Sequence, residues 1–152
     1  MNLDQLRDKS PMFEDMADEH FEFLASIATA READQGETLF RVNTPADRFF
    51  LVVSGTVALR ISGAGKPPAT IQTVGEGALL GLSWQIPPYR WQWTAETVTE
   101  TRLAEFDANV VLSACEIDEG LDNAMLRVIA RESGRRLHNV RMQLLDLYGR
   151  QP

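Results

Sequence analysis

The fold is decided by residues 36–57, whose sequence is Gly-Glu-Thr-Leu-Phe-Arg-Val-Asn-Thr-Pro-Ala-Asp-Arg-Phe-Phe-Leu-Val-Val-Ser-Gly-Thr-Val. Two runs of apolar and β-branched residues are separated by Asn43-Thr44-Pro45, a combination that favours a turn. The pair Ser54-Gly55 then predicts a tight hairpin, because glycine tolerates the positive φ that such a turn needs. This stretch therefore predicts consecutive short strands joined by tight turns.

The same pattern extends over residues 31–107, where short apolar runs are separated by Gly, Pro, Asn and Asp. Further turns are expected at 63–68 and 75–77. Seven short runs at near-regular spacing are typical of a β-sandwich or barrel. The expected strands are 38–42, 48–53, 56–61, 69–74, 78–80, 91–98 and 102–106.

Helical segments flank this β region on both sides. Residues 1–30 predict N-terminal helices, with Phe21, Leu24 and Ile27 spaced along one helical face. Residues 108–148 predict C-terminal helices: a short one over 108–115 capped by Asp107, and a long one from Gly120 to Tyr148. The expected fold class is α+β, mainly β: one domain over 1–152 in which an antiparallel, jelly-roll-like β-roll carries N-terminal helices and a long C-terminal helix.

Two apolar stripes run along the long helix. Leu121, Met125 and Val128 form an early stripe that we expect to pack on the β-roll. The second stripe is spaced four and three residues apart over three heptads, which is a coiled-coil pattern. We expect it to form a homodimer, and packing within the chain is the alternative. Its members are Leu126, Ala130, Ser133, Leu137, Val140, Leu144 and Leu147.

Composition excludes several classes of protein. The 152 residues (17.0 kDa) carry a formal net charge of −7, which argues against direct binding of nucleic acid. A single cysteine, Cys115, excludes an internal disulfide and cysteine-rich metal sites, and His20 and His138 lie in different helices, so we expect no metal. No nucleophile–base set is visible, so we expect no enzyme. No apolar run reaches 18 residues and the N-terminus is polar, so we expect a cytoplasmic protein without a membrane span.

Residues 36–57, together with the element order from about residue 10 to 148, resemble the cyclic nucleotide-binding domain family, in particular the sensor domains of catabolite activator and Fnr-like proteins. The resemblance implies a regulatory module that binds cyclic AMP or cyclic GMP and needs no other cofactor. In the transcription-factor branch a helix-turn-helix domain follows the long helix. Here residues 144–150 resemble the approach to that hinge, and we expect no recognition helix.

The resemblance also places the family's phosphate-binding cassette. Gly77 to Gly81 match its first glycine, strand and second glycine. Leu82 then falls where the family has a ribose-binding Glu, Arg90 where it has the phosphate-binding Arg, and Trp91 where it has a small residue. In an alternative register Gly75-Glu76 would be the Gly-Glu pair, but this leaves no preceding strand. An unpaired ribose hydroxyl costs about 1–3 kcal/mol, roughly a ten- to hundredfold loss of affinity.

The predicted ligand-binding residues follow from this register. They are Gly81, Leu82, Ser83, Arg90, Trp91 and Gln92, with Arg127 and Arg131 of the long helix as a possible lid. For these arginines and Arg135, which share one helical face, pairing with the acidic N-terminal segment is the favoured alternative. For Arg90, the alternative to binding an anionic ligand is an ion pair on the surface.

All three tryptophans lie close to Arg90. The aromatic side chains of this loop could stack on a planar ligand, anchor a partner or fill the roll; they are Trp84, Tyr89, Trp91 and Trp93. We favour filling of the roll for Trp93 and leave the roles of Trp84 and Trp91 undecided.

Two functions follow from these patterns. The first is a sensor in which a small anionic ligand shifts the long helix. The second is a protein-interaction module that keeps the fold without the ligand and docks through the aromatic loop. A third, weaker possibility is pairing with a related DNA-binding chain through the helical seam. A Trp91 ring inside the pocket would favour the second, and an open pocket with Arg90 pointing in would favour the first.

Overall fold

The computed structural model describes residues 3–61, 65 and 67–149. Residues 63, 64 and 66 of the expected turn, and Arg150 of the expected hinge approach, lie outside the described residues. The elements in chain order are α1 (Asp4–Arg7), η1 (Pro11–Phe13), α2 (Asp18–Ile27), β1 (Thr29–Ala33), β2 (Thr38–Phe40), β3 (Arg48–Ser54), β4 (Val57–Ile61), β5 (Ala69–Val74), β6 (Leu79–Leu80), η2 (Ser83–Gln85), β7 (Thr94–Thr97), β8 (Thr101–Asp107), α3 (Ala108–Ile117) and α4 (Glu119–Gly149).

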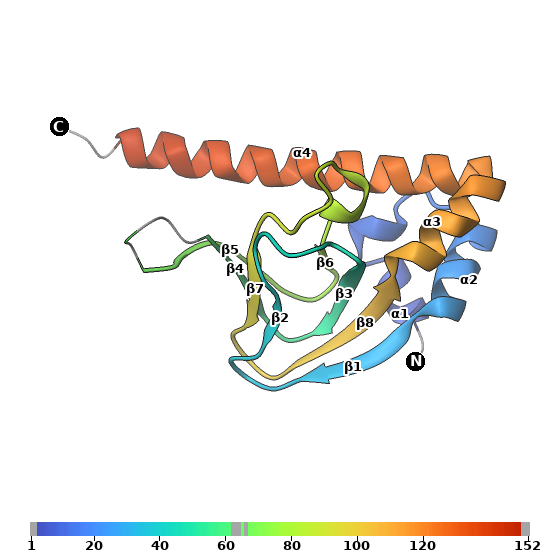
Figure 1. Cartoon of the computed structure of the whole chain (residues 1–152), viewed down its shortest axis with the longest axis horizontal. Helices are drawn as coiled ribbons and strands as arrows, with labels where there is room; N and C mark the ends of the chain where they lie inside the picture. The colour runs from blue at the N-terminus through green and yellow to red at the C-terminus, as the bar shows by residue number, and fades with distance from the viewer. Residues whose placement is uncertain (1–2, 62–64, 66, 150–152) are drawn as a thin grey trace.

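The strands form two antiparallel sheets that make up the β-roll. One has the strand order β1-β8-β3-β6 and the other β2-β7-β4-β5. The long helix α4 runs across the top of the roll, while α1, α2 and α3 gather at one end of it (Figure 1). The predicted fold class, an antiparallel β-roll with N-terminal helices and a long C-terminal helix, is confirmed.

The tight turn at Ser54-Gly55 links β3 to β4, but these strands belong to different sheets and do not pair with each other, so the predicted hairpin is instead a crossing between the sheets. Gly55 has a φ of +101°, and a Cβ there would lie 2.6 Å from the carbonyl oxygen of Glu100. Only glycine fits this turn without strain. The predicted turn is therefore required both by its own backbone and by the chain that packs against it.

Strand β3 explains the long apolar run of the quoted stretch, because both of its faces are buried. Phe49 and Leu51 join the cluster between the roll and the helices, whereas Phe50 and Val52 join the cluster inside the roll. All four side chains are 0% exposed. Since side chains alternate across a strand, burial of both faces needs an unbroken apolar sequence.

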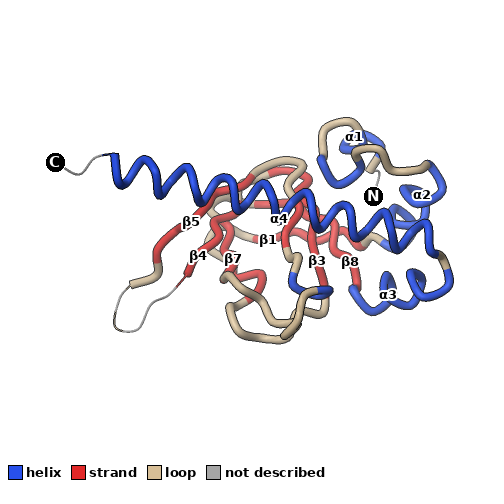
Figure 2. The backbone as a smooth tube through the Cα atoms, turned by 90° about the horizontal axis from the view of Figure 1, so that it is seen from above, coloured by secondary structure: helices blue, strands red, loops and turns tan. Residues whose placement is uncertain are grey.

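The helix α4 is anchored by its first turns and then leaves the core. Its buried side chains are Leu121, Met125, Val128 and Ile129, so the predicted packing of the early stripe on the chain's own core is confirmed. The remaining turns extend along the roll beyond α3 (Figure 2). Of the second stripe, Leu126, Leu137, Leu144 and Leu147 are about half exposed, and Ser133 and Val140 are half-buried.

Several expected boundaries were wrong. Strand β1 was missed, because residues up to 30 were assigned to the helical zone and its side chains are mostly exposed and polar. It pairs along its whole length with β8. The strand expected over 91–98 is formed only by Thr94–Thr97, since residues 91–93 belong to the preceding loop. The helix expected over 108–115 continues to Ile117, and α4 begins at Glu119, before Gly120.

Candidate functional site

A cavity of about 370 Å³ lies between the β-roll and α4. This volume falls in the usual range for small-molecule sites. The helix closes it from above with residues of its middle turns, and the roll forms its floor. The lining residues are Phe40, Leu82, Ser83, Ile86, Trp91, Gln92 and Trp93 from the roll and the following loop, and Ser133, Arg136, Leu137 and Val140 from α4.

Trp91 forms the inner wall of this cavity. Its ring stacks on Phe40 with centroids 4.0 Å apart and planes 19° apart, and the residue is only 4% exposed. The other edge of the ring lies against Gly81, where a Cβ would come within 2.6 Å of Trp91 Cζ3. The indole therefore fills the space beside Gly81, which the family resemblance reserves for close approach of a phosphate.

The loop that carries Trp91 is tied to the turn between β2 and β3. The amide of Trp91 donates to the carbonyl of Thr44 (2.9 Å), and the carbonyl of Trp91 accepts from the amide of Asn43 (2.8 Å). The amide of Ala46 donates to the carbonyl of Tyr89 (2.9 Å). The loop includes a cis peptide bond between Pro87 and Pro88. These backbone hydrogen bonds hold the ring of Trp91 in the roll.

Arg90 lies outside the lining of the cavity. Its side chain is exposed, and its Nη1 donates to the carbonyl oxygen of Asn43 (2.7 Å). Arg90 is thus placed at the turn around Asn43 and not among the lining residues. The role assigned to it from the sequence stays a prediction.

Arg136 is instead the charged side chain that lines the cavity among the described residues. Its Nη2 donates to the carbonyl oxygen of Leu79 on β6. Burial lowers the pKa of its guanidinium, an effect that the nearby Glu132 opposes. Sequence reasoning missed Arg136. Its position three residues after Ser133 and four before Val140, on the face of the second stripe, was the signal that could have found it.

The two predicted lid arginines lie elsewhere. Arg127 and Arg131 line a separate cavity of about 240 Å³, together with residues of the N-terminal segment and His20. Arg131 donates to the carbonyl of Glu14 (3.0 Å), and Arg135 pairs with the carboxylate of Glu14 (3.3 Å). The Arg135 ion pair matches the favoured alternative, whereas Arg131 binds a backbone carbonyl of the same segment. The lid role of Arg127 and Arg131 stays a prediction.

The other aromatic residues of the loop divide between core and surface. Trp84 is 3% exposed and stacks on Phe49 (5.1 Å between centroids), so it belongs to the cluster beneath the helices. Trp93 is half-buried and packs against the cluster inside the roll, as the favoured filling role requires, and it also lines the cavity. Tyr89 is exposed and adopts a φ of +60°. Of the predicted binding set, the cavity brings together Leu82, Ser83, Trp91 and Gln92. Their binding role stays a prediction.

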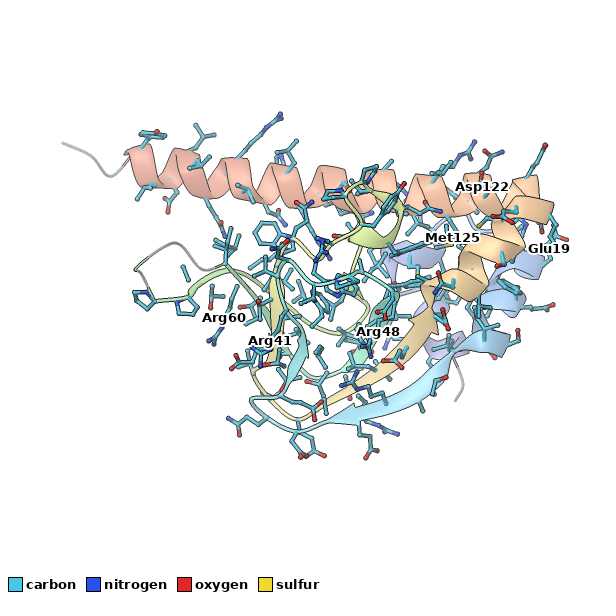
Figure 3. All side chains as sticks on the ribbon, in the orientation of Figure 1. Glu19, Arg41, Arg48, Arg60, Asp122 and Met125 are labelled. Atoms are coloured by element: carbon cyan, nitrogen blue, oxygen red, sulfur yellow. The ribbon has the colours of Figure 1, made fainter. Side chains whose placement is uncertain are left out.

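Two arginines of the roll, Arg48 and Arg60, are not among the residues that line this cavity. Arg48 pairs with Glu105 and Asp47, and Arg60 pairs with Glu96. Both lie on the strands of the roll rather than against α4, whereas Met125 lies on the underside of α4 (Figure 3). Arg136 therefore sets the charge of the cavity.

Three further features concern metal ions, the cysteine and membranes. Among the described residues, no group of three or more His, Cys, Asp or Glu side chains is placed to hold a metal ion. Cys115 is 7% exposed, and burial, reinforced by Asp122 and Asp118, raises the pKa of its thiol to about 11. In the described part of the chain, no helix combines the length and the apolar character needed to cross a bilayer.

Comparison with known proteins identifies a family model and several solved structures that match this chain. The family model described as "Cyclic nucleotide-binding domain" matches residues 30–118. A putative cyclic nucleotide-binding protein from Geobacter metallireducens is 25% identical, with a TM-score of 0.79 over 91% of this chain and 99% of that one. A cyclic nucleotide-binding domain from Methylobacillus flagellatus is 20% identical, with a TM-score of 0.80 over 93% and 80%.

A longer protein shares the fold over part of its length. The catabolite activator protein of Thermus thermophilus is 24% identical, with a TM-score of 0.74, and the match covers 91% of this chain and 63% of that one. No curated protein matches the sequence.

Proposed function

The chain belongs to the cyclic nucleotide-binding domain family, and on that premise we propose that it is a non-catalytic regulatory module that binds a small anionic ligand between the β-roll and α4. The observation that carries this proposal is the position of the cavity. Four of its lining residues, Ser133, Arg136, Leu137 and Val140, belong to the helix itself. A ligand bound there contacts both the roll and α4, so binding can change how the helix sits on the roll.

The output of such a module would be α4. Beyond residue 130 most of its side chains are exposed, and Leu137, Leu144 and Leu147 continue the coiled-coil spacing on that surface. We propose that this stripe pairs with a second copy of the chain, as a homodimer, or with a related DNA-binding chain. The net charge of −7 supports a module that does not bind nucleic acid directly, and we propose that it works in the cytoplasm.

Cyclic AMP and cyclic GMP are the first ligands to test, because the family resemblance implies them. Two observations count against the family's usual pose. Leu82 cannot accept a hydrogen bond from the ribose, and the ring of Trp91 fills the space beside Gly81. The anion would therefore bind to Arg136, the charged residue that lines the cavity.

A protein-interaction module is the second candidate function. By the criterion set from the sequence, the buried ring of Trp91 and the outward Arg90 favour it. The loop also presents Ile86 and Tyr89 at the surface, 37% and 52% exposed. In that case the partner would dock on the loop, and the cavity under α4 would have no ligand.

Calorimetry and hydrogen–deuterium exchange on the full chain separate the two functions. For the sensor, cyclic AMP, cyclic GMP or another small anion releases heat, and amide exchange slows in the turns around Arg136. Arg136→Gln weakens the binding, whereas Arg90→Ala leaves it nearly unchanged. If no small anion gives heat or alters exchange at millimolar concentration, the sensor proposal fails and the interaction module is left.

A further inference from the structure

The cavity under α4 differs from a nucleotide site in the kind of surface it offers. Seven of its side chains are apolar or aromatic: Phe40, Leu82, Ile86, Trp91, Trp93, Leu137 and Val140. Its polar groups are few, namely the hydroxyls of Ser83 and Ser133, the amide of Gln92 and the guanidinium of Arg136. A surface of this kind favours a ligand with an apolar body and little need for hydrogen bonds.

Arg136 gives this apolar cavity a single positive charge. One of its N–H groups donates to the carbonyl of Leu79, and a guanidinium has five N–H donors in all. The nearest carboxylate on its own helix, that of Glu132, is paired with Arg135. Partial burial deprives Arg136 of water, so an anion that reaches the remaining donors would form charge-assisted hydrogen bonds.

A cyclic nucleotide uses this surface poorly. Its ribose hydroxyl would lie near Leu82, which has no acceptor, and its phosphate would lie where the indole of Trp91 already contacts Gly81. A carboxylate is planar and smaller than a phosphate on a sugar. A single guanidinium can bind it in a two-pronged geometry without further donors. The groups present thus match one carboxylate on an apolar body better than a phosphate on a sugar.

We propose that the cavity takes a small apolar monocarboxylate, aromatic or aliphatic, whose carboxylate binds Arg136 and whose body lies among Leu82, Trp91, Trp93 and Leu137. This inference rests on the proposed function and specifies its ligand. The carboxylate joins α4 to the ligand and the apolar body joins the ligand to the roll, so the same molecule bridges both parts.

Titration of the full chain with matched probes tests the proposal. Phenylacetate and indole-3-acetate serve as aromatic acids and octanoate as an aliphatic one, and phenylacetamide and octanamide serve as uncharged counterparts. Calorimetry gives the affinities. For the probes without an indole ring, a change in tryptophan fluorescence reports occupancy of the cavity, because two of the three tryptophans, Trp91 and Trp93, line it. We expect at least one of the acids to bind, its amide to bind roughly tenfold to a hundredfold more weakly, and cyclic AMP to bind more weakly than the acid.

Variants of the arginine locate the carboxylate. Arg136→Gln should reduce affinity for the acid to that of the amide, with little change in affinity for the amide. Arg136→Lys should recover part of the affinity, because it keeps the charge and loses the two-pronged geometry. Arg141→Gln is the matched control, since Arg141 lies on the same helix, is exposed and is not among the residues that line this cavity. Thermal unfolding of each variant verifies that it folds.

Each remaining result decides against the proposal in a distinct way. Preferential binding of cyclic AMP or cyclic GMP would overturn the carboxylate assignment and leave the sensor intact. Equal affinity for acid and amide, or binding unaffected by Arg136→Gln, would also overturn it. Absence of binding for every acid and both cyclic nucleotides would overturn this inference and the sensor proposal together.

Discussion

The indole of Trp91 lies against the backbone of Gly81, so closely that a Cβ at residue 81 would come within 2.6 Å of the ring. Gly81 also adopts a φ of +92°, a conformation that L side chains rarely adopt. The two residues are ten positions apart in the chain, on either side of the aromatic loop. Their contact joins the end of β6 to the inner wall of the cavity and makes the shape of the site depend on one missing methyl group.

Gly81→Ala should lower the free energy of unfolding by about 1–3 kcal/mol, because it adds backbone strain and a clash with Trp91. Urea denaturation followed by circular dichroism measures the change. Gly134→Ala is the control: a Cβ there meets no atom within 4 Å, and alanine favours a helix by roughly 0.5–1 kcal/mol over glycine. A Gly81→Ala protein as stable as the Gly134→Ala protein would contradict the contact.

Trp91→Ala should cost about 3–5 kcal/mol, since it removes a buried indole from the stack with Phe40. Trp93→Ala should cost clearly less, because Trp93 is only half-buried. Guanidinium unfolding of the two variants in parallel gives the comparison. Similar losses for both would mean that Trp91 does not hold the interior of the roll.

Replacing Leu144 and Leu147 together with Glu should shift the chain toward the monomer without lowering its thermal stability at low concentration. Both side chains are about half exposed and lie on the second stripe of α4, so they make few contacts within the chain. Sedimentation velocity over a range of concentrations measures the association. Met142→Glu, an exposed substitution away from the stripe, should leave it unchanged. A wild type that is monomeric at every concentration would refute self-association through α4.

Cys115 should make stability fall with pH in the alkaline range. Burial raises the pKa of its thiol from 9.0 to about 11, so the folded chain favours the neutral thiol. Below pH 9 the thiol is neutral in both the folded and the unfolded state, and its full contribution to the free energy of unfolding is present. That contribution is lost as the pH rises from 9 to about 11. Cys115→Ala should flatten the dependence over that interval. At pH 8 the native thiol should react with a disulfide reagent far more slowly than the unfolded one.

Much of the fold could be predicted because its determinants are local. Three features depend on only a few neighbouring residues each: the two-sided apolar run of β3, the glycine of the turn after β3, and the early stripe of α4. Strand β1 could not be predicted, because its exposed side chains mostly lack the apolar pattern. Its strand conformation comes from pairing with β8, which lies about seventy residues away in the chain.

The candidate site was harder to predict than the fold. From the sequence, Arg90 was the expected anion-binding residue, and Arg127 and Arg131 were a possible lid with pairing to the N-terminal segment as the favoured alternative. In the structure Arg90 binds the turn at Asn43, and Arg131 binds the N-terminal segment. Such choices depend on which carbonyls and carboxylates lie within reach in space, and spacing along the chain does not contain that information.

By itself, the sequence determined the order of the helices and of strands β2 to β8, the tight turn at Gly55 and the apolar faces that had to be buried. Only the tertiary structure decided which cation enters the cavity. Burial of Leu121, Met125, Val128 and Ile129 sets the rotation of α4 about its axis. That rotation turns Arg136 toward the roll and Arg131 toward the N-terminal segment. The physical reason is that a helix presents its side chains at fixed angles, and packing against the rest of the chain fixes the direction in which those angles point.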